Sequence, residues 1–375
     1  MIENNIMTRE KKIKIWIFTL KTGLGGGGLC GFELAKALER SGQHIRVVCK
    51  RGSEIHFEST KMGYDTLALG LENQSVFRNI LFSKKSFFEL RTALSSDCPD
   101  LVVVPMSSPL HIFCLSLFRK SKVKYFTLLH EPVLRRGNYG VNGFIAHAMQ
   151  KIEIKKSDFF FTLSDFAKIQ STADGYPSKC DAVVHPVFES HLHKSSGLLE
   201  DGSRKILFFG RDVPSKGLRR LVDSFSILQQ RANYRVNLIL CLNGPVRTLP
   251  FAQSGIELVF GYQDSNTLVR RIIESDVVAL PYENATQSGV IALSLGVGCP
   301  CVVTPVGGLP EQVIDGLNGA VAVDMSPEAF ADALNRCLAD SKVYASLLEN
   351  IRVDNQKRLN WDRLSARVIN RFFEH

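Results

Sequence analysis

The fold is decided by residues 276–319, which read DVVALPYENATQSGVIALSLGVGCPCVVTPVGGLPEQVIDGLNG. Short apolar runs predict buried strands over 277–280 and 301–304, because prolines and glycines bound them. Between them, a polar loop over 282–287 leads into a helix that opens at Ser288. Backbone N–H groups at such a helix start can bind phosphate, since the positive end of the helix dipole lies there. The same features also fit an ordinary strand–helix–strand unit whose glycines only cap the helix.

The length and composition indicate a globular protein of several domains. A chain of 375 residues predicts two or three domains, each with its own core. No apolar run reaches the roughly 18–20 residues that span a bilayer, and the run at 16–20 is too short for a signal peptide. The nine cysteines show no CxxC pair, which predicts free thiols in a reduced, cytoplasmic protein rather than a disulfide or zinc scaffold.

The net charge of +9 would suit nucleic acid, an anionic membrane or phosphorylated substrates as partners. No nucleic-acid motif accompanies the charge, so nucleic acid ranks last among these partners. Residues 75–94 predict a basic amphipathic helix, which can lie on anionic lipid or pack on a sheet with its charges in water.

The first half opens with a strand over 13–20, a glycine loop over 22–28 and a helix over 29–40. Gly23, Gly25 and Gly28 fit the dinucleotide-binding pattern GxGxxG. The next strand, 45–49, is followed by Lys50 and Arg51 instead of the acid that an NAD ribose requires, so NADP stays open as a ligand. The four consecutive glycines, 25–28, argue against a simple tight turn, because each costs backbone entropy on folding.

Further strands over 101–105, 124–129, 159–163 and 183–187 complete a doubly wound first half, with a helix over 110–118. His130 follows the strand 124–129, at the carboxyl end where ligands of open α/β sheets bind. On the sequence alone, His130 also fits an ordinary loop residue that hydrogen-bonds to the backbone.

The second half begins with a strand at 205 and the loop GRDVPSKG, in which Arg211 and Lys216 flank a turn before a helix. Such a pair of cations can neutralise a diphosphate, although surface cations are usually solvated. Gly261 follows a later strand over 256–260. The stretch 189–204 has little apolar periodicity and is the best linker between the halves.

These separated motifs together resemble the retaining GT-B glycosyltransferases of family 4, and the loop 285–290, ATQSGV, is similar to that of one bacterial branch. The resemblance covers most of the chain and implies two Rossmann-like α/β domains that face each other across a donor/acceptor cleft. It implies an acceptor domain over 1–188, a linker over 189–204, a donor domain over 205–359, and a last helix, 360–375, that crosses back to the first domain. The site residues that it implies are His130, Arg211 and Lys216 for catalysis, and Gly26, Gly27, Gly28, Gly261, Thr286, Gln287, Ser288, Gly289 and Val290 for the donor.

The resemblance also implies a mechanism, in which protein cations and N–H groups stabilise the departing nucleoside diphosphate without a metal or other cofactor. The chain departs from the family at the pattern E-x7-E, where Ala285 and Leu293 stand in place of the two acids. Thr286 and Gln287 are then the candidates for the sugar contacts, and Glu283 is the nearest replacement carboxylate.

The expected function is transfer of a sugar from a UDP- or GDP-sugar to a glycan or lipid-linked sugar, in surface polysaccharide synthesis. The expected place is the cytoplasm, with peripheral contact at the inner face of an anionic membrane. Two alternatives remain: a nucleotide-sugar-binding protein without catalysis, because the acid pair is absent, and an NADP-dependent oxidoreductase built on the first glycine loop.

Overall fold

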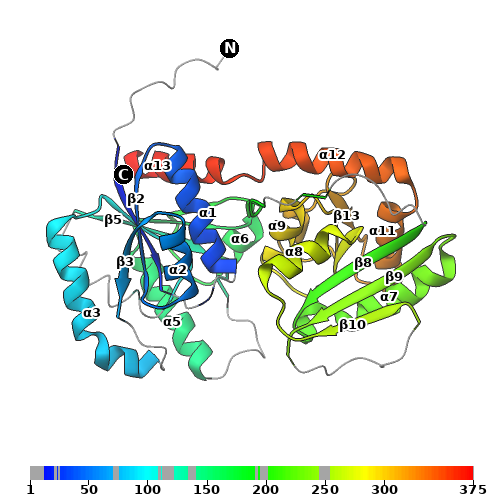
Figure 1. Cartoon of the computed structure of the whole chain (residues 1–375), viewed down its shortest axis with the longest axis horizontal. Coiled ribbons are helices and arrows are strands. Elements are labelled where there is room, and N and C mark those ends of the chain that lie inside the picture. The colour runs from blue at the N-terminus through cyan, green and yellow to red at the C-terminus, as the bar shows by residue number, and fades with distance from the viewer. Residues whose placement is uncertain are drawn as a thin grey trace, which may run out of the picture. The chain divides into compact units, whose positions relative to one another are not determined.

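The chain forms two compact α/β units in a computed structural model (Figure 1). The structure describes residues 12–20, 23, 26–70, 76–108, 111, 122–133, 141–190, 193–194, 202–244 and 254–374, without the side chains of 76–85 and 141–142. The first unit comprises 1–162, 168–181 and 361–375, and the second comprises 163–167 and 182–360.

The first unit is built on a seven-stranded sheet in the order β3-β2-β1-β4-β5-β6-β7. Each pairing from β3 to β6 is parallel, which requires crossover connections of the kind that helices provide. The strands are β1 (Lys14–Thr19), β2 (His44–Lys50), β3 (Asp65–Leu69), β4 (Leu101–Val104), β5 (Lys124–Leu129), β6 (Phe159–Thr162) and β7 (Cys180–Ala182).

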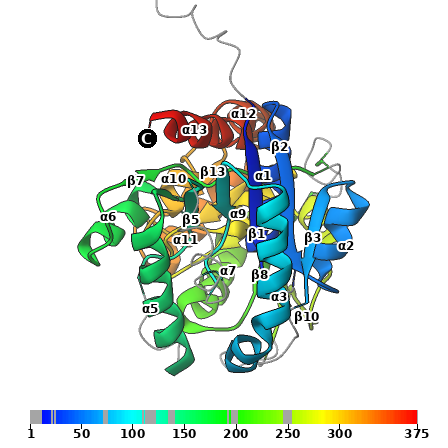
Figure 2. The same cartoon turned by 90° about the vertical axis from the view of Figure 1, so that its left-hand side faces the viewer.

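Helices lie around this sheet, as the quarter turn in Figure 2 shows. They are α1 (Gly26–Arg40), α2 (Glu54–Lys61), α3 (Val76–Ser96), α5 (Val141–Lys156), α6 (Asp165–Ala173) and α13 (Trp361–Glu374). The last helix packs on α1, and Arg40 Nη2 lies 2.8 Å from the Asp362 carboxylate. The first turn of α6 clusters with the second unit.

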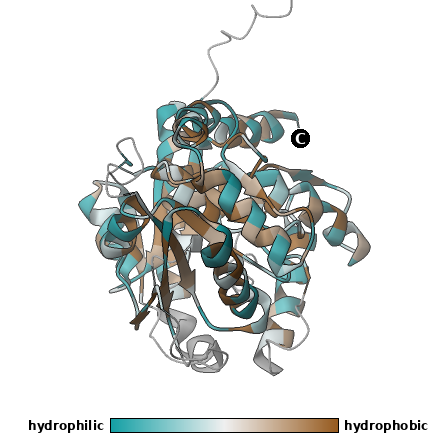
Figure 3. Cartoon of the chain, turned by 90° about the vertical axis from the view of Figure 1, so that its right-hand side faces the viewer, coloured by the Kyte–Doolittle hydropathy of each residue, from teal (hydrophilic) through white to brown (hydrophobic). Residues whose placement is uncertain are grey.

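The second unit is built on a six-stranded parallel sheet in the order β10-β9-β8-β11-β12-β13. Its strands are β8 (Ser203–Gly210), β9 (Arg235–Leu242), β10 (Ile256–Phe260), β11 (Val277–Leu280), β12 (Cys301–Val303) and β13 (Gly319–Val321). Its helices are η1 (Pro214–Lys216), α7 (Leu218–Arg231), α8 (Ser265–Ile273), α9 (Gly289–Gly296), α10 (Leu309–Gln312), α11 (Pro327–Leu338) and α12 (Ser341–Lys357). Figure 3 shows the contrast between apolar strands and helices that mix apolar and polar residues.

Each sheet reverses its strand order once. The reversal lies between β1 and β4 in the first unit and between β8 and β11 in the second. Open parallel sheets bind ligands outside the carboxyl ends of the strands at such a switch point. In the second unit, this place lies between the loop that follows β8 and the loop that follows β11.

The structure corrects three details of the expected organisation. The helix α1 begins at Gly26, so Gly26, Gly27 and Gly28 form its first turn rather than the loop before it. The strand expected at 183–187 is absent, and β7 ends at Ala182. Residues 182–188 cluster with the second unit, because Val187 N donates to Leu359 O and Phe188 N donates to Ala292 O.

The helix expected at 110–118 lies outside the described residues, apart from His111. Most of the expected linker, 189–204, also lies outside them, and β8 already begins at Ser203. The eight described cysteines are free thiols, all of them buried except Cys98. None of the helices in the described residues combines the length and the apolar composition that crossing a bilayer requires.

Candidate active site

The loop from 211 to 217 carries the two expected cations directly beyond β8. Arg211 is the first residue after the strand and is exposed, while Lys216 is half-buried at the end of η1. Gly217 follows with a left-handed backbone (φ 63°), and a Cβ there would lie 1.8 Å from the Pro281 carbonyl oxygen. Only glycine allows this approach, so the KG pair in the sequence has a steric cause.

The close approach joins the β8 loop to the loop that follows β11. Glu283 N donates to Ser215 O at 3.0 Å. Arg220, in the first turn of α7, donates to Pro281 O at 3.0 Å, and its Nη1 lies 2.7 Å from the Glu283 carboxylate. The Lys216 ammonium lies over the Tyr282 ring, with Nζ 3.6 Å from the ring centroid. Lys216 is therefore held beside the loop from the neighbouring strand at the switch point.

The expected donor loop, 285–288, is more buried than its polar sequence suggests. Thr286 and Ser288 are buried, whereas Gln287 is half-buried. The Gln287 Oε1 atom is itself buried and has no hydrogen-bond partner among the described residues. An unpaired buried amide oxygen costs roughly 1–3 kcal/mol, which marks Gln287 as the side chain of this loop with capacity for a ligand.

Two consecutive glycines, Gly307 and Gly308, pack closely against the backbone of the donor loop. A Cβ on Gly307 would lie 1.7 Å from the Ala285 carbonyl oxygen, and one on Gly308 would lie 2.1 Å from that of Thr286. Gly308 N donates to Ala285 O at 3.1 Å. The Thr286 carbonyl oxygen also accepts from Ser164 Oγ at 2.6 Å. The loop backbone is therefore fixed on both sides.

Gln312 holds the start of α9 through a pair of amide hydrogen bonds. Its Oε1 accepts from Ser288 N at 2.7 Å, and its Nε2 donates to Ser288 O at 3.1 Å. The side chain is 1% exposed. The Ser288 N–H, which was expected among the phosphate donors, is therefore occupied. Gly289 and Val290, in the first turn of α9, remain the candidates for that role.

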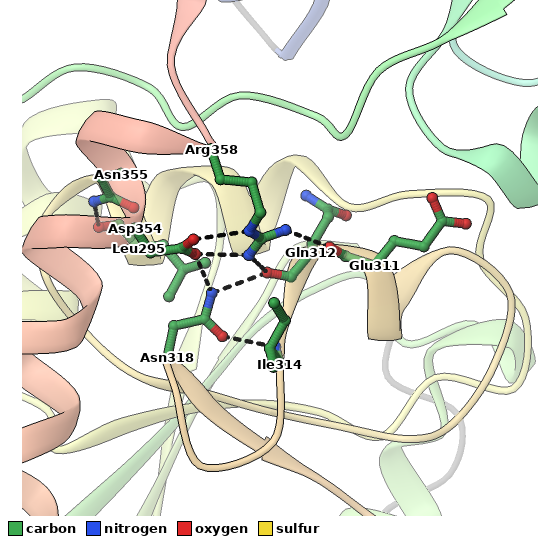
Figure 4. Close-up of polar contacts among 8 residues, drawn as sticks. All are labelled: Leu295, Glu311, Gln312, Ile314, Asn318, Asp354, Asn355 and Arg358. Atoms are coloured by element: carbon green, nitrogen blue, oxygen red, sulfur yellow. Dashed lines mark hydrogen bonds and ion pairs between the residues drawn. The ribbon is translucent and has the colours of Figure 1, made fainter. Parts of the chain in front are cut away.

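A polar network fixes Gln312 in turn, as Figure 4 shows. The Gln312 carbonyl oxygen accepts from Asn318 Nδ2 at 3.0 Å and from Arg358 Nη2 at 3.1 Å. Asn318 Nδ2 and Arg358 Nη2 also donate to the Asp354 carboxylate, at 2.9 Å and 2.6 Å. The helix α12 thus anchors the segment that positions the donor loop.

Replacing Gln312 with Leu is expected to lower the free energy of unfolding by about 1–3 kcal/mol, because the buried Ser288 N–H would lose its acceptor. Chemical denaturation measures this change. The matched control is Gln356→Leu, since Gln356 is exposed and the same substitution there removes no buried contact. Equal effects of the two substitutions would contradict the role assigned to Gln312.

Apolar residues, Ala285 and Leu293, occupy the two positions where the family pattern E-x7-E has acids. Ala285 is buried, and Leu293 packs against the core of the second unit. Glu283, the nearest replacement carboxylate in the sequence, pairs with Arg220 in this structure. The role of Glu283 as a replacement acid stays a prediction, as does the sugar contact expected of Gln287.

The first unit contains the remaining expected residues around its own switch point. His130, after β5, is half-buried, and its Nε2 lies 2.8 Å from Pro105 O, just beyond β4. A Cβ on Gly27 would meet the Met106 side chain at 2.3 Å, and one on Gly28 would lie 3.1 Å from Gly23 O. The ends of β4 and β5 and the first turn of α1 therefore converge at one edge of this sheet.

Gly261 lies at the end of β10, away from the other candidates in its sheet. It is exposed, has φ 99°, and donates its N–H to Leu242 O at 3.0 Å. Two strands, β9 and β8, separate β10 from β11 and its donor loop. The structure therefore places Gly261 on the β9–β10 side of the switch point, apart from Thr286 and Gln287.

Sequence reasoning missed Tyr282, Gln312 and the Arg358 network. The signal for Tyr282 was an aromatic residue two positions after a predicted strand, and for Gln312 a polar residue directly before the apolar pair Val313 and Ile314. Neither reveals its partner, because the contacts join segments that lie far apart in the sequence. Among the described residues, no group of three or more His, Cys, Asp or Glu side chains could hold a metal ion.

Comparison with known proteins identifies the class. Residues 203–340 match the family described as glycosyl transferases group 1. An uncharacterized glycosyltransferase of Methanocaldococcus jannaschii is 28% identical over 285 residues, which are 69% of this chain and 72% of that protein. The chain is an enzyme of the glycosyltransferase class.

Two further similarities extend this result. A D-inositol 3-phosphate glycosyltransferase of Xylanimonas cellulosilytica is 36% identical over 95 residues, which span only 22% of that protein. The structure of Anabaena Alr3699/HepE in complex with UDP-glucose is similar with a TM-score of 0.68 and 15% identity, over 96% of this chain and 99% of that chain. The glycosyltransferase thus has the GT-B fold, with two parallel-sheet Rossmann-like domains.

Proposed function

We propose that this glycosyltransferase is a retaining enzyme of family 4, in the ATQSGV branch, that takes its sugar from a UDP- or GDP-sugar. The observation that carries the proposal is the position of Lys216, held beside the donor loop at the β8/β11 switch point. The neighbouring Arg211 and the helix start at Gly289 add positive potential to the same edge of the sheet. The complex of the similar Anabaena protein with UDP-glucose supports this class of donor.

The chemistry follows from the charge that develops when the donor breaks. As the bond between the sugar and the diphosphate lengthens, negative charge builds on the β-phosphate and the sugar becomes oxocarbenium-like. Lys216, Arg211 and the N–H groups of Gly289 and Val290 are suited to stabilise that phosphate. Gln287, whose buried Oε1 has no hydrogen-bond partner among the described residues, is suited to accept from a sugar hydroxyl. On the family resemblance, His130 acts next to the donor sugar.

Transfer with purified enzyme tests the proposal. The enzyme is incubated with UDP- and GDP-sugars and candidate glycan or lipid-linked acceptors, and proton NMR records the anomeric configuration of donor and product. The proposal expects the same configuration in both. Inversion would exclude a retaining mechanism, and donor binding without transfer to any acceptor would favour a binding protein.

We further propose that no metal ion or other cofactor takes part, since protein cations lie at the proposed phosphate site. Adding EDTA is expected to leave the transfer rate within about twofold of the untreated enzyme. The measurement is the initial rate of nucleoside diphosphate release. Loss of activity with EDTA that magnesium or manganese restores would contradict metal independence.

The proposed acceptor is a lipid-linked sugar or glycan of surface polysaccharide synthesis, reached by peripheral contact with the inner face of the membrane. The supporting observation is α3, on which Phe88 is 69% exposed close to the exposed Arg91. Sedimentation with vesicles tests the contact: binding to anionic but not neutral vesicles is expected, and equal recovery with both would contradict it.

A further inference from the structure

Tyr282 provides a rigid aromatic face for the ammonium of Lys216. The ring is 2% exposed and belongs to the core of the second unit. Its backbone is held on both sides, since Tyr282 O accepts from Thr304 Oγ1 at 2.6 Å and the following N–H donates to Ser215 O at 3.0 Å. The backbone that carries the ring is therefore joined to the residue after β12 and to η1.

The contact between the Lys216 ammonium and the Tyr282 ring differs from an ion pair in its effect on the charge of the ammonium. The nearest acid in the sequence, Glu283, is paired with Arg220. A ring face attracts a cation through its quadrupole but neutralises none of the positive charge. Lysine has a flexible four-carbon stem that loses rotamer freedom when it is ordered. The ring thus orders the ammonium and leaves its full charge for an anion.

The Tyr282 hydroxyl takes no part in this contact. Its oxygen is buried and has no hydrogen-bond partner among the described residues. A phenylalanine would present the same face and would bury no hydroxyl. The chemistry of the contact therefore requires an aromatic ring and not a tyrosine as such.

We propose that Tyr282 is a positioning residue, whose ring holds Lys216 for the diphosphate of the donor. This inference rests on the proposed function, because it assumes that Lys216 binds that diphosphate. It adds a residue that does not touch the donor and acts only through Lys216.

A double-mutant cycle with UDP and GDP as probes tests this inference, with Kd measured by calorimetry. Tyr282→Leu is expected to weaken binding roughly tenfold, and Tyr282→Phe is expected to bind much more tightly than Tyr282→Leu. In a Lys216→Ala background, Tyr282→Leu should change Kd less than about twofold, because the ring then has no cation to hold.

The possible outcomes distinguish failure of the inference about Tyr282 from failure of the proposed function. A wild type that binds neither nucleotide overturns both the inference and the proposed function. If Lys216→Ala weakens binding and Tyr282→Leu weakens it by the same further factor in both backgrounds, only the inference is overturned. Equal losses in Tyr282→Phe and Tyr282→Leu would also overturn it, because the hydroxyl would then be the active group.

A second series keeps the test valid if the leucine variant fails to fold. Phenylalanine and its increasingly fluorinated derivatives are incorporated at position 282, which preserves the ring while weakening its quadrupole. Affinity for the bound nucleotide should fall steadily with fluorination. Constant affinity along the series would contradict an electrostatic role for the ring.

Discussion

Replacing Lys216 with Ala lowers the rate of sugar transfer by about 10²–10³-fold, if this ammonium stabilises the charge that develops on the donor. The loss should appear mainly in kcat, because that charge is greatest in the transition state. Initial rates at saturating donor measure it. The overall fold should persist, since Lys216 is half-buried and its side chain lies over the face of one ring.

The matched control is Arg219→Ala, three residues further along the chain. The Arg219 side chain is 86% exposed, and its Nε is 4.0 Å from the Asp223 carboxylate. Such an exposed pair contributes little, so the control should transfer at close to the rate of the unmodified enzyme. A comparable loss in both variants would mean that net positive charge, rather than the position of Lys216, governs the rate.

Replacing Gly217 with Ala is expected to lower the free energy of unfolding by roughly 3 kcal/mol and to weaken donor binding with it. The new Cβ would lie 1.8 Å from Pro281 O, so the β8 loop or the β11 loop must shift. That shift would also separate Lys216 from Tyr282. Chemical denaturation and nucleotide titration measure the two effects.

Gly316→Ala is the control that separates the effect of the steric clash at Gly217 from the effect of the left-handed backbone conformation. Gly316 has φ 73°, close to the 63° of Gly217, but a Cβ added there would meet no atom within 4 Å. Alanine should therefore cost only about 1 kcal/mol at this position, which is the cost of the left-handed conformation alone. Equal destabilisation at both positions would contradict the steric role of Gly217.

Much of the second unit could be predicted from the sequence, because its strands are short apolar runs bounded by glycine and proline. The strand at 277–280 is confirmed as β11, and the helix that opens at Ser288 is confirmed as α9, with Ser288 as its cap. The same approach placed the last strand of the first half at 183–187. It failed there because an apolar run that packs between segments has the same sequence pattern as a strand.

The candidate site could be predicted only in part. The loop positions of Arg211 and Lys216 were predictable, because a turn after a strand is a local feature. The hydrogen bond that occupies the Ser288 N–H was not predictable, because its partner Gln312 is 24 residues away. The pairing of Glu283 with Arg220 was likewise invisible, since it depends on two strands being neighbours in the sheet.

The most direct test of a nucleotide-sugar site in the second unit is a thermal-shift panel with UDP, GDP, their common sugar derivatives and NADP. A ligand at about 100 times its Kd adds roughly 2.7 kcal/mol of stability. We expect stabilisation by either the UDP or the GDP series, and we expect Lys216→Ala to reduce it. Stabilisation by NADP alone, unchanged in Lys216→Ala, would contradict this account and favour the glycine-rich start of α1 as the ligand site.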